Sequence, residues 1–414
     1  MNMNLGQGNI QTESSSLKLP LLIIVTGILE LVVFFLLSLL SLAEINPASP
    51  RYPSGWAFTH LFVLGGASMI AMGAVYQLVP VVVNRPLYSK RMGLVHYGLF
   101  VIGHIGLVTG FFLFKTDWMA LFATFLFLAI LLFAANIVIT LVKAKQWDPV
   151  TIHVVFALLG LILAGLTGMI MGYDFALGQV GTTHNQLLSA HLWLGAAGWF
   201  GNLIVGFTYK LLPMFSISHN YSVKPQKIAL ILLNIAILSG AGSAFLASDS
   251  VITKVPFILL SLGFLFFVDA TRRIRKSGIK KNPGAGIAFT LKINTLMAIT
   301  LLFLAGAVFL ASGQQPFIVS IWIGLWGWVY FTIIGYMSKI VPFLWWTFKY
   351  GSQVGKEKVP MLHQLINEKR VYWLLNANAL SFLVTTLGIV LSSSALFGMG
   401  FILFLISGLF YISI

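Results

Sequence analysis

Long apolar runs restrict this chain more than any other feature of its sequence. There are twelve of them, each at least as long as the ~20 residues that an α-helix needs to cross a bilayer. They lie at 19–43, 56–83, 92–114, 118–142, 150–173, 186–215, 226–248, 251–271, 287–311, 316–346, 371–393 and 395–414. Because the hydrocarbon core offers the backbone no hydrogen-bond partner, such segments must satisfy their own backbone groups as helices. The sequence predicts an all-α, polytopic membrane protein of about twelve transmembrane helices, with residues 1–414 as a single transmembrane helical domain.

The composition agrees with this prediction and removes several kinds of site. Hydrophobic residues make up 58% of the chain and charged residues 8%, which excludes an ordinary soluble protein. The absence of cysteine excludes disulfides, thiolate metal sites, iron–sulfur clusters, covalent c-type haem attachment and a cysteine-ligated dinuclear copper centre. Residues 1–18 are polar and the apolar run after them is long enough to span. We therefore expect a cytoplasmic tail and a retained first helix, not a cleaved signal peptide.

Positive charge is divided unequally between the loops. The loops after odd-numbered runs hold only Arg51, Lys115 and Lys254. The loops after even-numbered runs hold Arg85, Lys90, Arg91, Lys143, Lys145, Lys224, Lys227, Arg272, Arg273, Arg275, Lys276, Lys280, Lys281, Lys349, Lys356, Lys358, Lys369 and Arg370. The positive-inside rule then predicts a cell-membrane protein with both termini in the cytoplasm.

This basic cytoplasmic face also accounts for the net charge of +15, so nucleic acid is not expected as a partner. The run RRIRKSGIKK at 272–281 is interpreted as a topogenic patch that faces the lipid bilayer. The stretch 349–370 mixes charges of both signs and is expected to be a solvated cytoplasmic loop.

A glycine–proline pattern occurs three times, and its copies are almost evenly spaced along the chain. Its members are Gly65, Gly73 and Pro80; Gly198, Gly206 and Pro213; and Gly327, Gly335 and Pro342. Glycines eight apart on an α-helix lie about 20° from one another, so each copy is expected to carry a smooth strip that a helix or a flat cofactor can approach closely. The regular recurrence predicts three pseudo-repeated blocks of four helices.

Three of the eight histidines are predicted at similar depth in the outer half of the membrane. His60 is expected about 6 Å below the outer edge, His191 about 8–9 Å and His104 about 12 Å, at 1.5 Å per residue. His184 is expected at the outer mouth. A histidine within a span is costly and marks a functional hypothesis, and imidazole is a usual ligand of haem and copper. A metal-free hydrogen bond between helices is the alternative for each of them.

His60 and His191 each begin a copy of the repeat, but not in register. His191 lies two positions further from Pro213 than His60 lies from Pro80. Among the carboxylates, Glu30 is the candidate for proton handling, because it lies in the middle of the first run. A hydrogen bond between helices is an equal alternative for this residue.

The pattern resembles the catalytic subunit (subunit I) of the haem–copper oxidases, here as a short, stand-alone and divergent member. The resemblance is carried by HLFVLGG…GAVYQLVP, HLWLGAAGW…GFTYKLLP and GLWGWVYFTIIGYMSKIVPFLWW, and it covers nearly the whole chain. The superfamily includes oxygen reductases, nitric oxide reductases and haem-and-copper membrane proteins of the nitrosative-stress response. The resemblance implies that His60 is an axial ligand of a low-spin haem and that His191 is a copper ligand.

Other ligands of the family are missing. The family's tenth helix carries the second low-spin ligand and the proximal ligand of the high-spin haem. Here the run at 316–346 contains no histidine, and Trp322 stands where the first copy has His60. The family's seventh helix carries two copper ligands, whereas the run at 226–248 has no histidine. The usual dinuclear centre therefore cannot be assembled, and ordinary terminal oxygen reduction is not expected.

The leading prediction is a haem-binding membrane protein, with copper as a further candidate metal, for electron transfer, for binding oxygen or nitric oxide, or for handling haem or copper. His60, His104 and His191 are the predicted ligands of a b-type haem, the sharpest expectation being a haem between His60 and His104. His191 and His184 are the predicted copper ligands. A quinol or a redox donor protein would supply electrons. Two alternatives stay open: a metal-free transporter, channel or assembly factor, and an oxidoreductase of the oxygen or nitric oxide reductase type with unusual ligands.

Overall fold

The fold is described from a computed structural model, which describes residues 8–45, 51–178, 181–246, 251–310 and 315–414. Its α-helices are α1 (Gly8–Leu40), α2 (Pro53–His60), α3 (Met69–Val82), α4 (Lys90–Phe112), α5 (Thr116–Ala144), α6 (Pro149–Leu177), α7 (His184–Leu192), α8 (Asn202–Ser216), α9 (Lys224–Ser243), α10 (Val255–Ser277), α11 (Ala285–Leu310), α12 (Gln315–Trp322), α13 (Phe331–Tyr350), α14 (Glu368–Val390) and α15 (Ser394–Ile412). No strand occurs in these ranges, where pairing is limited to two isolated β-bridges.

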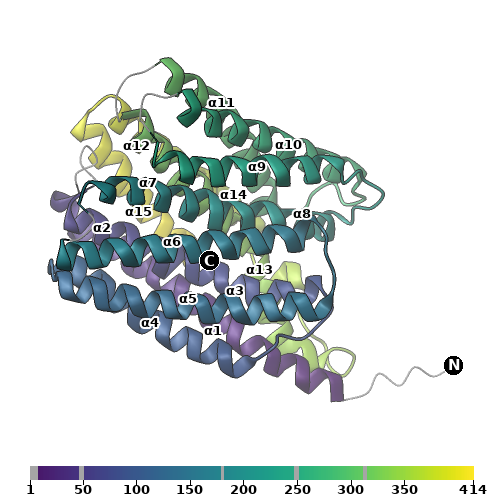
Figure 1. The fold of residues 1–414 in the computed structure, drawn as a ribbon. Helices are drawn as coiled ribbons and strands as arrows, with labels where there is room; N and C mark the ends of the chain where they lie inside the picture. The colour runs from purple at the N-terminus through teal and green to yellow at the C-terminus, as the bar shows by residue number, and fades with distance from the viewer. Residues whose placement is uncertain (1–7, 46–50, 179–180, 247–250, 311–314) are drawn as a thin grey trace.

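Twelve continuous helices in the described residues are long and apolar enough to cross a membrane, and each overlaps one of the twelve predicted runs. They run roughly parallel, with α9, α10 and α11 along one side of the bundle and α1, α4 and α5 along the opposite side (Figure 1). The predicted fold class is confirmed. The first helix begins earlier than its apolar run, because residues 9–19 are polar in part but contain no glycine or proline to stop a helix.

Three π-helical segments complete the long helices that carry the repeat. The segments η2 (Leu61–Ser68), η4 (Trp193–Gly201) and η6 (Ile323–Tyr330) join α2 to α3, α7 to α8 and α12 to α13. All three end at the same offset before their repeat proline. A π segment is rare and frequently marks a functional site. The three copies therefore share a local backbone distortion as well as a sequence pattern.

The repeat glycines are contact points for neighbouring helices. A Cβ added at Gly198 would lie 3.2 Å from the Cα of Gly160 on α6, and one added at Gly206 would lie 2.7 Å from the Cβ of His153 on the same helix. A Cβ added at Gly73 would lie 2.6 Å from the side chain of Ile24 on α1. The smooth strips are thus covered by α6 in the second copy and by α1 and α4 in the first.

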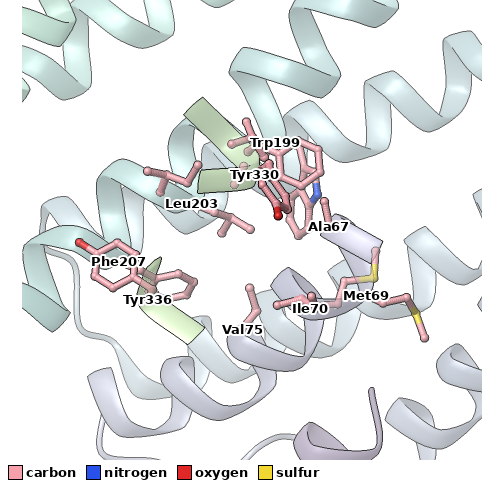
Figure 2. Packing of buried hydrophobic residues seen from close by; sticks show 14 of the residues in the cluster. Ala67, Met69, Ile70, Val75, Trp199, Leu203, Phe207, Tyr330 and Tyr336 are labelled. Atoms are coloured by element: carbon pink, nitrogen blue, oxygen red, sulfur yellow. The ribbon is translucent and has the colours of Figure 1, made fainter. Parts of the chain in front are cut away.

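The three repeat helices meet in the centre of the bundle, where Trp199 and Tyr330 lie close to Ala67 (Figure 2). The indole of Trp199 donates to the hydroxyl of Ser68 at 3.1 Å and joins the second copy to the first. The hydroxyl of Tyr336 donates to Thr208 at 2.9 Å and joins the third copy to the second. Buried aromatic and aliphatic side chains fill the space around these two hydrogen bonds.

Candidate functional site

The three outer histidines lie at one end of the bundle, at which α2 and α7 begin and α4 ends. We refer to it as the predicted outer end. His60 is seven residues from the start of α2, and His191 is seven residues from the start of α7, so each lies about 10 Å along its helix. His104 is eight residues before the end of α4, which is about 12 Å. The helix bounds thus give the three histidines similar depths.

His60 and His191 face one another across the helices that carry the first two copies. Their ring centroids are 6.3 Å apart and their ring planes differ by 32°. Nδ1 of His60 lies 2.8 Å from the carbonyl oxygen of Trp56, and Nδ1 of His191 lies 2.8 Å from that of Ala164. Because a carbonyl oxygen can only accept, each Nδ1 carries the proton and donates it. Each Nε2 is left as a lone-pair nitrogen, the state in which a histidine binds a metal.

The shift in register decides which way His191 faces. The residue of the second copy that corresponds to His60 by distance from the proline is Trp193. Trp193 packs against Gly240 of α9 and lies 5.1 Å from the ring of Phe257 on α10. Two residues turn an α-helix by about 200°, so His191 faces the opposite way, toward α6. A histidine in strict register would not face His60.

The surroundings of the pair are closely packed. The ring of Phe111 lies 4.9 Å from that of His60, and the ring of Trp56 lies 5.9 Å from Phe111. On the other side, a Cβ added at Gly168 would lie 3.1 Å from Cε1 of His191. Both histidines are partly buried. The flanks of the pair are therefore filled by protein.

His104 is engaged differently. Its Nδ1 lies 3.8 Å from the carboxylate of Glu30 on α1. Its ring lies directly on the backbone of the first copy, since a Cβ added at Gly65 would lie 2.6 Å from Cε1 of His104. Its Nε2 is buried and has no hydrogen-bond partner in the described part of the chain. The packing on Gly65 leaves no space for a macrocycle between His104 and this helix, so a haem ligated by His60 and His104 does not fit. The contact between Glu30 and His104 agrees both with proton handling by Glu30 and with a simple hydrogen bond between helices.

His184 does not join His191. Its Nδ1 pairs with the carboxylate of Asp174 at 2.7 Å, which ties the start of α7 to the end of α6. Seven residues of α-helix separate His184 from His191 by about 10 Å, too far for one ion to bind both. The sequence analysis does not identify Asp174 as a partner of His184. The signal that could have found it is the position of this aspartate at the edge of a long apolar run.

Two further histidines lie toward the other end of the bundle in buried polar contacts. Nδ1 of His96 is 3.2 Å from the hydroxyl of Tyr76, and Nδ1 of His153 is 2.7 Å from the amide oxygen of Asn202. Asn202 in turn exchanges hydrogen bonds with Asn234 on α9. These contacts join α3 to α4 and α6 to α8 and α9. Over the described ranges, no group of three or more His, Asp or Glu residues is arranged to hold one metal ion.

Aromatic rings fill the space between the first and third copies, where the resemblance implies a low-spin haem. Phe62 of η2 stacks on Trp326 of η6 with centroids 3.8 Å apart and planes 26° apart. Phe34 of α1 lies 5.0 Å from Trp326. Trp322, which stands at the position that His60 has in the first copy, donates its indole proton to Thr386 at 3.0 Å. A haem does not fit between these two helices, since the stacked rings occupy the place of a flat cofactor.

A small cavity lies among η4, α9, α10, α11 and η6. Its volume is about 110 Å³. Its walls are mainly apolar, with Trp193, Phe264, Met297 and Trp328 among them, and none of the residues that line it is a histidine. The resemblance implies copper and high-spin haem ligands on the helices around this space. The cavity offers no imidazole to either group, which agrees with the missing ligands in the sequence.

The family model described as Cytochrome C and Quinol oxidase polypeptide I matches residues 9–248. The comparison with curated proteins found no match. The matched range contains Glu30, His60, His104, His184 and His191, and so includes every site residue proposed from the sequence.

Proposed function

The chain belongs to the cytochrome c and quinol oxidase polypeptide I family, and we propose that it is a copper-binding membrane protein of this family that holds one copper ion between His60 and His191. The family supports a multi-pass protein that resembles the haem–copper oxidases. The missing ligands argue for copper handling or one-electron transfer in place of oxygen reduction at a dinuclear centre.

The geometry of the histidine pair carries the proposal. Metal–imidazole nitrogen distances are about 2.0–2.1 Å, so one ion would reach two imidazole nitrogens that are up to about 4 Å apart. If both Nε2 atoms pointed at one ion, each ring would add the distance from its nitrogen to its centroid, and the total would be close to the 6.3 Å observed between the centroids of His60 and His191. Hydrogen bonds from Nδ1 to backbone carbonyls fix the orientation of metal-binding histidines. Both rings have such a bond.

The donor set favours copper over other groups. Imidazole suits copper, zinc, iron and nickel, and copper forms the most stable complexes among the divalent first-row metals. Zinc sites take four ligands, or three and a water, whereas this site offers two imidazoles. A haem between His60 and His104, or between the first and third copies, is opposed by Gly65 and by the Phe62–Trp326 stack. A single metal ion does not need the space that the macrocycle of a haem requires.

Backbone carbonyls orient the two imidazoles of the proposed site, and aromatic rings cover one of its flanks. The carbonyls of Trp56 and Ala164 hold the two rings in the tautomer that presents Nε2. The rings of Phe111 and Trp56 cover one flank and restrict water there. A bound copper ion would supply one-electron redox chemistry. A quinol or a donor protein stays the predicted source of electrons.

Metal and haem content of the purified protein tests the proposal. The detergent-solubilised protein is loaded with copper, desalted and measured by mass spectrometry for copper and iron and by the pyridine haemochromogen assay for haem. We expect about one copper per chain, little haem, and loss of the copper when His60 and His191 are both replaced by alanine. Replacement of His219 and His363, which lie outside the spans, is the control and should leave the copper in place.

The alternative functions give different results in the same measurement. Stoichiometric b-type haem would support the haem-binding alternative and overturn the copper site. A well-folded protein that retains neither copper nor haem would support a metal-free transporter, channel or assembly factor. Uptake of oxygen or nitric oxide with a quinol donor would support a reductase with unusual ligands.

A further inference from the structure

A basic pocket lies between α10 and α11, at the end of the bundle opposite the histidine pair. It has a volume of about 440 Å³ and is lined by Arg272 and Arg275 of α10 and by Lys292 of α11. All three cations are exposed, and two helices supply them to one pocket. From this convergence we infer that the pocket binds the phosphate group of an anionic phospholipid.

The three cations have no protein counter-charge. The nearest carboxylate along α10 is Asp269, and it is already paired with Arg273 at 2.8 Å. No hydrogen bond or ion pair of the Arg272, Arg275 or Lys292 side chains occurs within the part of the chain that the structure describes. Three unpaired cations around one pocket repel each other, and this repulsion is relieved when an anion binds among them.

The depth of Lys292 points to a lipid rather than to a soluble anion. This residue is seven positions from the start of α11, about 10 Å along a helix that spans the membrane. A charged side chain at such a position is costly unless it reaches the interface or finds a partner. The headgroup phosphate of a neighbouring lipid is the anion that is already present at this depth.

The apolar surface next to the pocket has the form that acyl chains require. Leu296, Ile299 and Phe303 follow Lys292 at intervals of four, seven and eleven residues, and so share one face of α11. All three are exposed on the bundle, with 75% of Phe303 accessible. On α10, Leu265 lies seven residues before Arg272 and is exposed as well. A phosphate site above an exposed apolar strip matches a diacyl phospholipid.

Guanidinium groups are suited to this ligand. Arginine presents parallel N–H donors that bind two phosphate oxygens at once, and lysine adds a point charge. Basic pockets between transmembrane helices at the cytoplasmic side bind acidic lipid headgroups, and the loop charges predict that this end of α10 and α11 is cytoplasmic. The inference does not depend on copper, because the pocket shares no residue with the histidine pair.

Native mass spectrometry with added phosphatidylglycerol tests the site. We expect one tightly retained phosphatidylglycerol per chain. We expect at least tenfold weaker retention when Arg272→Gln, Arg275→Gln and Lys292→Gln are combined. Thermal unfolding of the same variant should give a melting temperature close to that of the parent without lipid, and a smaller rise on lipid addition.

A matched variant separates a defined site from a generally basic surface. Lys276→Gln, Lys280→Gln and Lys281→Gln remove the same number of charges, all from the basic run at 272–281 and all from outside the pocket. This variant should retain the lipid. Equal weakening in both variants would overturn the site, as would equal retention of phosphatidylcholine. Displacement of the lipid by millimolar inorganic phosphate would assign the pocket to a free anion and overturn the lipid assignment.

Discussion

A double-mutant cycle on His60 and His191, with copper affinity as the measured quantity, is the sharpest test of the proposed copper site. Each single alanine substitution removes one of the two imidazoles that face each other at 6.3 Å. Loss of an outer-shell partner alone typically lowers metal affinity 10–100-fold, so loss of a ligand should lower it by at least about 100-fold. That corresponds to about 2.7 kcal/mol at about 1.4 kcal/mol per tenfold change.

The double variant should bind copper no more weakly than either single variant. Two ligands of one ion act as a unit, so once one imidazole is removed the other contributes little. Two separate sites would instead show losses that add, and each single variant would retain half of the copper. Competition between the detergent-solubilised protein and a coloured copper(I) chelator measures these affinities directly.

His184→Ala is the matched control for this cycle. His184 lies on the same helix as His191, about 10 Å away, and pairs with Asp174. Its removal should leave copper affinity within about threefold of the parent, because its distance from the pair exceeds any metal–nitrogen bond. A 100-fold loss in this control, or additive losses in the cycle, would refute the two-histidine site.

Two further predictions concern stability. Gly160→Ala should destabilise the protein by about 1–3 kcal/mol, because its Cβ would lie 2.7 Å from the backbone of Gly198, whereas Gly98→Ala meets no atom within 4 Å and should change the melting temperature little. Asp174→Asn should remove the ion pair with His184 and cost about 1 kcal/mol or less, with copper binding unchanged. Thermal unfolding in detergent and copper content measure both outcomes, and a Gly160→Ala protein as stable as the parent would contradict the close approach of α6.

Most of the fold follows from hydropathy, because the bilayer limits a long apolar run to one conformation. Hydropathy does not predict the three π-helical segments. A π segment changes the hydrogen-bond partner from i+4 to i+5 without a characteristic composition, so Leu61–Ser68 is indistinguishable in sequence from α-helix. The glycine strips were predicted from α-helical geometry, and α6 and α1 do cover them in two copies.

The site was predicted only in part, because sequence gives depth along a helix more readily than direction around it. His60, His104 and His191 were assigned similar depths, and the helix bounds agree. The expected partner of His60 was His104, on the next antiparallel helix. In the structure His104 lies on Gly65 and beside Glu30 and contacts the backbone of His60, while the imidazole nearest to that of His60 is His191, 6.3 Å away between centroids. Which histidines face each other depends on how three helices are rotated about their axes.

The departure of His191 from the repeat register determines on which side of the second copy its imidazole lies. In strict register the second copy would carry its histidine at Trp193, which faces α9, α10 and the apolar cavity. The displacement of two residues turns the imidazole toward α6 and His60. The third copy has Trp322 at the position that His60 occupies in the first, and Trp326 stacks on Phe62 in the space between the first and third copies. The same helices thus close one cofactor position with aromatic rings and bring two imidazoles together on the other side of the first copy.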